Sequence, residues 1–193
     1  MKIYLVRHGQ TEYNVRDLLQ GWTDNELNEN GIKQAIELSE KLKYEKFDVI
    51  FCSNLKRAYQ TAKIISENNI FKPQLVIDKR IREQNMGDWE GKEYSKLVEE
   101  HKDFFIKVSQ NPFLFNPPNG ENFSDVVKRV SSFLKDLEYK NYEKILIVSH
   151  QIVNSIIFKL LNNVDWKNFW KYKQKNSEIW ILELKNYRTI TNT

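Results

Sequence analysis

Short apolar runs alternate with longer amphipathic stretches along most of this chain. Each short run is rich in Ile, Val, Leu or aromatic residues and is bounded by polar or turn-forming residues. Continuous apolar runs of this length are typical of strands that are buried on both faces of a sheet. The expected strands cover residues 2–7, 48–52, 74–78, 144–149 and 178–184.

The stretches between these runs carry apolar residues at helical spacing, which predicts amphipathic helices. The expected helices cover residues 29–43, 54–68, 122–137 and 151–162. Asn28 is expected to cap the first helix, and Ser53 or Asn54 the second. The buried face of the first helix is expected to contain Ile32, Ala35, Ile36 and Leu42.

Strands that alternate with helices predict an α/β fold, a three-layer αβα sandwich with a mostly parallel central sheet. Residues 1–193 are interpreted as a single domain. The least regular stretch, 91–120, contains three of the four prolines and an amphipathic pattern between residues 94 and 105. This stretch is expected to be a cap-like insertion, a small subdomain of helices and loops.

The composition is that of a soluble globular protein, with 40% hydrophobic and 29% charged residues in 193. No apolar stretch approaches the roughly 18 residues of a membrane span, and the start of the chain does not resemble a signal peptide. A cytoplasmic protein without a membrane partner is therefore expected. The net charge of +4 shows no concentrated basic stripe, which argues against nucleic-acid binding. The single cysteine, Cys52, is interpreted as a core residue.

Charged and imidazole side chains follow two of the predicted strands directly. Arg7 and His8 stand at the end of the strand 2–7, and His150 follows the strand 144–149. Ligands of parallel α/β sheets bind beyond the carboxyl ends of the strands, so these residues are expected to share one edge of the sheet. The third histidine, His101, lies among charges and is expected at the surface.

An anion site and a proton donor complete the candidate chemistry. Arg57 lies in the first turn of the helix after strand 48–52, where the helix dipole also favours an anion. Two guanidinium groups, Arg7 and Arg57, suggest a phosphate, which such groups bind in bidentate fashion. The loop 81–91 can supply an acid for a departing oxygen, and the spacing alone does not choose among Glu83, Asp88 and Glu90.

Five motifs appear in a fixed order: LVRHGQTEYN, SNLKRAYQTA, IREQNMGDWEG, PPNGENF and IVSHQ. With them the chain resembles the histidine phosphatase, or phosphoglycerate mutase-like, superfamily. The resemblance implies that His8 is a nucleophile that becomes a phosphohistidine, and that Glu83 is the proton donor. It implies that Arg7, Arg57 and His150 surround the phosphoryl group and take part in catalysis. The implied substrate-binding residues are Arg7, Asn14, Gln20, Gly21, Arg57, His150 and Gln151. No cofactor or metal is implied.

Two positions depart from the family pattern. Gln151 stands where the family commonly has a glycine, and its side chain is expected to narrow the pocket. Asn122 replaces a serine at the start of the helix 122–137, where it can still act as a cap.

The resemblance leaves two activities to compare, hydrolysis and mutase chemistry. The stretch 91–120 contains no arginine that could grip the carboxylate of phosphoglycerate, and the chain ends soon after its last predicted strand. Both features favour a phosphatase acting on a small phosphorylated metabolite. The chain is similar to the branch of broad-specificity and α-ribazole phosphatases, which makes α-ribazole phosphate, and hence cobalamin biosynthesis, a candidate. A cofactor-dependent phosphoglycerate mutase is the alternative, and a non-catalytic phosphate-binding module is less favoured. The oligomeric state stays open.

A set of aromatic residues bears on the leaving group of the substrate. They either form a second small core or face the pocket, and in the latter case an apolar or aromatic leaving group fits. These residues are Trp22, Phe104, Phe105, Phe113, Phe115 and Phe123.

Overall fold

The computed structural model describes residues 1–184 and contains a mostly parallel sheet. Within these residues, five strands are arranged in the order β3-β2-β4-β1-β5. The pairs β1–β4, β2–β4 and β2–β3 are parallel, and β5 runs antiparallel to β1. The prediction of a mostly parallel sheet is confirmed. The strands are β1 (Lys2–Arg7), β2 (Val49–Cys52), β3 (Gln74–Ile77), β4 (Lys144–Ser149) and β5 (Ile179–Glu183).

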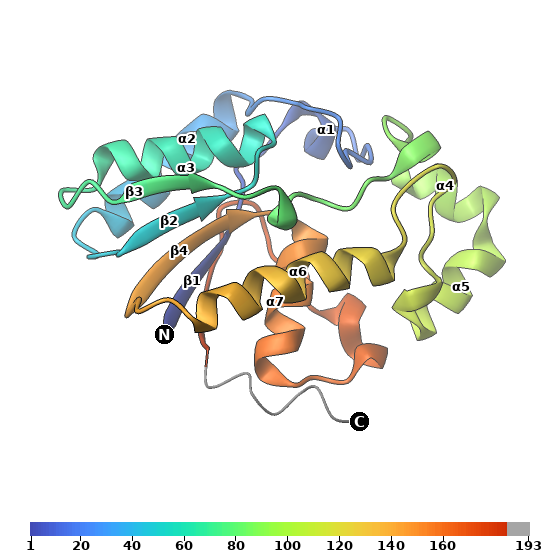
Figure 1. The fold of residues 1–193 in the computed structure, drawn as a ribbon. Helices are drawn as coiled ribbons and strands as arrows, with labels where there is room; N and C mark the ends of the chain where they lie inside the picture. The colour runs from blue at the N-terminus through green and yellow to red at the C-terminus, as the bar shows by residue number, and fades with distance from the viewer. Residues whose placement is uncertain (185–193) are drawn as a thin grey trace.

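Helices cover both faces of this sheet, which confirms the three-layer arrangement. Helices α2 and α3 lie on one face and α6 and α7 on the other (Figure 1). The α-helices are α1 (Glu12–Val15), α2 (Glu29–Leu42), α3 (Lys56–Asn68), α4 (Tyr94–Glu100), α5 (Lys102–Gln110), α6 (Phe123–Glu138) and α7 (Gln151–Asn162). Short 3-10 helices are η1 (Lys79–Ile81), η2 (Gly87–Trp89), η3 (Pro112–Leu114) and η4 (Trp166–Lys171).

The alternation of side chains along each strand produces two hydrophobic cores, one on each face. In β4, Leu146 and Val148 belong to the core under α2 and α3, whereas Ile145 and Ile147 belong to the core under α6 and α7. Burial of each such side chain stabilises the fold by roughly 1.5–3 kcal/mol. The central strands are therefore held between two apolar layers, and their carboxyl ends are fixed relative to one another. Cys52 is buried in the first of these cores, as predicted.

The face of α2 that is buried differs from the prediction. Ile32 and Ile36 are 44% and 45% exposed, and the buried face consists of Gly31, Ala35, Leu38, Ser39 and Leu42. A close backbone contact decides this orientation, because a Cβ atom on Gly31 would lie only 2.0 Å from the carbonyl oxygen of Gln10. The glycine, rather than the neighbouring isoleucine, therefore faces the rest of the protein. The predicted cap by Asn28 is confirmed.

The caps predicted for two other helices are wrong. Helix α3 has Leu55 at its N-cap position without a side-chain cap. Its first backbone amide, that of Lys56, instead donates to the Asp24 carboxylate at 2.7 Å. At the start of α6, Asn122 makes no capping bond, because its amide donates to Asp125. A contact from a distant segment thus replaces the cap of α3, whereas at α6 the Asn122 side chain bonds within its own helix.

The stretch 91–120 contains two helices rather than the single predicted one. The chain turns at His101 between α4 and α5, and the exposed imidazole stacks on Trp89 at 5.8 Å between ring centroids. Both helices stand beyond the carboxyl ends of the strands, which is the position of a cap (Figure 1). We keep the interpretation of one domain with this insertion for the described residues; residues 185–193 of the predicted range lie outside them. Across residues 1–184, no helix is both long and apolar enough to cross a membrane.

Candidate active site

The two strand-end histidines lie side by side. The parallel register pairs Arg7 with Ser149, so the residues that follow them, His8 and His150, are also neighbours. Their ring centroids are 5.1 Å apart, and the backbone amide of His8 donates to the carbonyl of Ser149 at 3.0 Å. Both imidazoles are almost completely buried. The geometry of parallel strands thus brings together two residues that are 142 positions apart, by the difference of their numbers.

The imidazole of His8 is held in a form that suits a nucleophile. Its Nδ1 lies 2.7 Å from the carbonyl oxygen of Gly9, which accepts a hydrogen bond only if Nδ1 carries the proton. Burial, and then the positive charges of Arg57 and Arg7, hold the pKa of His8 well below its ordinary value. The ring is therefore neutral, and the lone pair is on Nε2.

Two arginines, the buried Arg57 and the partly buried Arg7, flank this imidazole. Arg57 donates from its two terminal nitrogens to the carbonyls of Thr23 and Gly21, both at 2.9 Å, and Arg7 donates to the carbonyl of Gln174. The Nε atoms of both arginines are buried without a hydrogen-bond partner. Burial lowers the pKa of Arg57 to about 10, which leaves the guanidinium charged at neutral pH. The pair forms a cationic site whose remaining donors suit an anion.

His150 adds further unpaired groups beside this site. It is not among the residues that line the cavity, but neither of its buried ring nitrogens has a partner within the described residues. Burial, and then the charge of Arg57, lower the pKa of His150 well below its usual value. A buried polar group without a partner is costly, and an anion held between the arginines would supply one.

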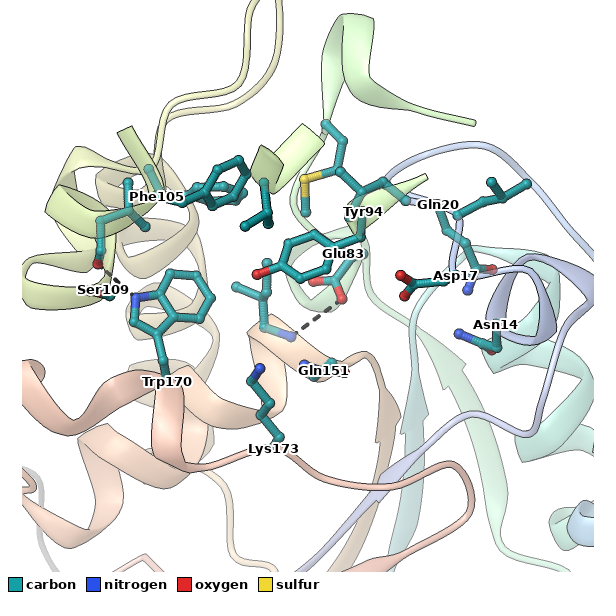
Figure 2. Close-up of a pocket in the computed structure, with 18 of the residues that line it drawn as sticks. Asn14, Asp17, Gln20, Glu83, Tyr94, Phe105, Ser109, Gln151, Trp170 and Lys173 are labelled. Atoms are coloured by element: carbon teal, nitrogen blue, oxygen red, sulfur yellow. Dashed lines mark hydrogen bonds between the residues drawn. The ribbon is translucent and has the colours of Figure 1, made fainter. Parts of the chain in front are cut away.

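Of the three candidate acids, only Glu83 lines the cavity. Its side chain is 8% exposed, and its carboxylate accepts hydrogen bonds from the backbone amides of Gln84 at 3.0 Å and Ile152 at 3.3 Å. Burial raises the pKa of Glu83, although those bonds and the two arginines oppose the shift. Asp88 is exposed and bonded to Asn119, and Glu90 is bonded to backbone amides elsewhere. Among the three candidates, Glu83 is thus the carboxyl group that lines the cavity and has a raised pKa (Figure 2).

The other residues predicted to bind substrate also line the cavity, namely Asn14, Gln20, Gly21 and Gln151. The oxygen of the Asn14 amide accepts bonds from the amide and hydroxyl of Thr11, both at 3.1 Å. Its nitrogen is therefore the group that Asn14 can offer to a ligand. Gln20 is held by the same Thr11 hydroxyl at 2.9 Å, and Gln151 opens helix α7.

One cavity of about 760 Å³ is lined by Arg7, His8 and Arg57 and extends to residues of α4 and α5. Aromatic residues and two lysines also line this cavity: Tyr94, Phe105, Phe115, Trp170, Lys102 and Lys173. Figure 2 shows Phe105 and Trp170 on the side of the cavity away from Asn14, with the Tyr94 ring next to Glu83 in this view. The remaining predicted aromatic residues, Trp22, Phe104, Phe113 and Phe123, are not among the lining residues. Phe105 and Phe115 thus face the pocket, whereas Phe104 and Phe123 pack in the core under α6 and α7 rather than in a separate second core.

Sequence reasoning missed the segment before β5 whose residues bond to the backbone of Leu5, Arg7 and His8. The side chain of Gln174 donates to the Leu5 carbonyl at 2.8 Å, and Asn176 donates to the carbonyl of His8 at 2.9 Å. The amide of Ser177 donates to the carbonyl of Arg7 at 3.0 Å. The segment reads as a polar loop in the sequence, and no periodicity distinguishes it from other polar loops.

Metal-ligating residues do not gather in the described part of the chain. Among residues 1–184, no group of three or more His, Cys, Asp or Glu side chains is placed to hold a metal ion.

Comparisons with known proteins agree with this geometry. The family model described as "Histidine phosphatase superfamily (branch 1)" matches residues 3–192. A protein of Hydrogenobacter thermophilus, provisionally named phosphoserine phosphatase 2, is 38% identical over 92% of this chain and 87% of its own. The adenosylcobalamin/alpha-ribazole phosphatase of Salmonella typhimurium is 33% identical over 90% and 85%.

Solved structures and further relatives extend the comparison. The alpha-ribazole phosphatase from Shigella flexneri superimposes with a TM-score of 0.83 at 30% identity, covering 97% of this chain and 92% of its own. Phosphoglycerate mutases are similar as well, over a smaller share of the chain.

Proposed function

We propose, on the premise that this chain belongs to the histidine phosphatase superfamily and is one of its phosphatases, that it hydrolyses small phosphomonoesters through a phosphohistidine on His8. One observation carries the proposal. A neutral, buried imidazole with its Nε2 lone pair available lies between two charged arginines, and a carboxyl group with a raised pKa lines the same cavity.

In the first step, Nε2 of His8 attacks phosphorus while the bond from phosphorus to the leaving oxygen breaks. Arg7, Arg57 and His150 stabilise the charge on the phosphoryl oxygens, which is the main form of catalysis in phosphoryl transfer. Glu83 gives its proton to the leaving oxygen. The alcohol departs, and the enzyme holds a phosphohistidine and an ionised Glu83.

In the second step, a water molecule enters on the side from which the alcohol left. The Glu83 carboxylate takes a proton from this water as its oxygen attacks phosphorus, and the bond to Nε2 breaks. Inorganic phosphate forms, and Glu83 is protonated again. The hydrogen bond from Nδ1 to Gly9 keeps the released imidazole in its starting tautomer.

Hydrolysis is favoured over transfer to a second phosphoglycerate. The insertion contains no arginine, and Lys102 is its only basic residue among those lining the cavity. With 3-phosphoglycerate and 2,3-bisphosphoglycerate together, we expect release of inorganic phosphate without conversion to 2-phosphoglycerate. Coupled assays for the two products measure this, and formation of 2-phosphoglycerate faster than free phosphate would favour the mutase alternative.

The size and walls of the cavity suggest the kind of leaving group. The whole cavity, about 760 Å³, is within the range of sites for drug-sized ligands, and phosphoserine would fill only the part beside Arg7 and Arg57. The aromatic walls suit a flat, apolar group, which supports α-ribazole phosphate as a candidate substrate. Phosphoserine, named in one relative, is the second candidate. A panel containing both, with sugar phosphates and phosphoglycerates, tests the choice by comparing kcat/KM.

Replacing Tyr94 by alanine is expected to lower kcat/KM for α-ribazole phosphate by about 10-fold, because a stacking surface is lost. The value for phosphoserine should change by less than about 2-fold, since that substrate has no aromatic group to stack on the ring. Phe113→Ala is a matched control: Phe113 lies in the same insertion and is exposed to a similar degree, 42% against 38% for Tyr94, but does not line the cavity. Equal losses of kcat/KM on both substrates would show that Tyr94 does not determine the substrate preference.

A further inference from the structure

One short loop, Gln20–Thr23, contacts both the cationic site and the acid. The carbonyls of Gly21 and Thr23 accept the two hydrogen bonds of Arg57. The indole nitrogen of Trp22, between them, donates to the backbone carbonyl of Glu83 at 2.7 Å. The position of this loop therefore determines where Arg57 points and how far it lies from Glu83.

The carboxylate of Glu90 accepts four hydrogen bonds, three of them from this loop. Its Oε1 accepts from the amides of Trp22 at 2.7 Å and Met86 at 3.2 Å. Its Oε2 accepts from the amide of Thr23 at 2.8 Å and from the Thr23 hydroxyl at 2.6 Å. Bonds to an ionised acceptor are roughly twice as strong as neutral ones, so one carboxylate joins the loop to the chain segment that follows Glu83.

The fit between this carboxylate and the loop is close. Gly21 has a φ of +52°, and a Cβ atom there would lie 2.1 Å from Oε1 of Glu90. Both the left-handed backbone and the space required by the carboxylate favour glycine at this position. Glu90 itself does not line the cavity, so it cannot be the group that protonates the leaving oxygen.

We propose that Glu90 is a positioning residue for phosphoryl transfer: its carboxylate fixes the Gln20–Thr23 loop so that two backbone carbonyls aim Arg57 at the phosphoryl group. The inference rests on the proposed function, and it adds a residue that acts only through Arg57. Because two of the five guanidinium donors are bound to carbonyls of this loop, a shift of the loop rotates the plane of the guanidinium. Misplacement by about 1 Å at such a group costs on the order of 100-fold in rate.

The test is Glu90→Gln. This substitution keeps the shape of the side chain but presents an amide NH₂, in place of one oxygen, to the donors that bond to the carboxylate. We expect kcat/KM for p-nitrophenyl phosphate to fall about 10- to 100-fold, with a parallel loss of affinity for inorganic phosphate measured by calorimetry. Asp88→Asn is the matched control, an exposed acid two positions away, and should stay within about 2-fold on both measurements.

A double-mutant cycle separates positioning from a general structural role. In an Arg57→Ala background, Glu90→Gln should cost less than about 3-fold, because the group through which Glu90 acts is already absent. An equal loss in both backgrounds, or full activity of Glu90→Gln, overturns the proposal. If Glu90→Gln does not fold, Thr23→Val removes the 2.6 Å bond alone and should show a smaller loss with the same dependence on Arg57.

Failure of the proposed function would give a different result from failure of the Glu90 proposal. The wild-type protein would then not hydrolyse p-nitrophenyl phosphate at all, while the phosphate affinities of the same variants would still report whether Glu90 acts through Arg57.

Discussion

Replacement of His8 by alanine is expected to lower kcat for p-nitrophenyl phosphate by at least about 10⁴-fold, as for other enzymes that lose their nucleophile. The arginines remain in this variant, so inorganic phosphate should still bind. No other imidazole is expected to take over, because His101 is exposed and outside the cavity and His150 is assigned to the phosphoryl oxygens rather than to attack on phosphorus.

The measurement pairs steady-state rates with rapid quenching after incubation with a ³²P-labelled substrate. The wild-type protein should retain acid-labile, alkali-stable label, and His8→Ala should retain none while its circular dichroism is unchanged. His101→Ala serves as the control, because this third histidine is exposed and outside the cavity. Near-normal turnover by His8→Ala would refute a phosphohistidine at this position.

Replacement of Glu83 by glutamine is expected to separate substrates by their leaving groups. An alkyl phosphate needs a proton on the departing oxygen, so its kcat should fall about 10²- to 10⁴-fold. The nitrophenolate of p-nitrophenyl phosphate departs without one, and its loss should be much smaller. Asp88→Asn, the exposed acid in the same loop, should leave both substrates unaffected. The opposite pattern, with Asp88→Asn sensitive to the leaving group, would move the acid role to Asp88.

The pH profile follows from the same residue. Burial raises the pKa of Glu83, so the carboxyl group keeps its proton to a higher pH than an exposed glutamate. The first step needs the protonated form, hence kcat/KM for an alkyl phosphate should decline as the pH rises through this raised pKa. Glu83→Gln should lose that limb, since an amide does not titrate there. An unchanged limb in the variant would assign the titration to another group.

The strands and most helices could be predicted because their signals are local. β1 and β4 begin and end at the predicted residues, since continuous apolar runs identify strands buried on both faces. The rotation of α2 could not be predicted, because the contact of Gly31 with Gln10 outweighs the two apolar side chains left exposed. The cap of α3 was missed for the same reason, as Asp24 reaches it from another segment.

The candidate site divides in a similar way. Arg7, His8 and His150 could be expected together because parallel strands align their carboxyl ends, a consequence of topology alone. The sequence left Glu83, Asp88 and Glu90 as equivalent acids before any resemblance was considered, since all three lie in one loop. Only in the structure does burial distinguish Glu83 from the other two acids. Four hydrogen bonds hold the Glu90 carboxylate against Trp22, Thr23 and Met86.

By itself the sequence determined the layered α/β fold, the shared edge for two histidines and two arginines, and the phosphate chemistry that these side chains suggest. Only the tertiary structure decided which of the three carboxyl groups lines the cavity, which aromatic residues line it, and which polar loop supports His8. The physical reason is the distance along the chain between the residues that interact. Periodicity and strand ends are encoded by neighbours along the chain, whereas the pKa of a side chain and the walls of a cavity depend on contacts between residues that are far apart in the sequence.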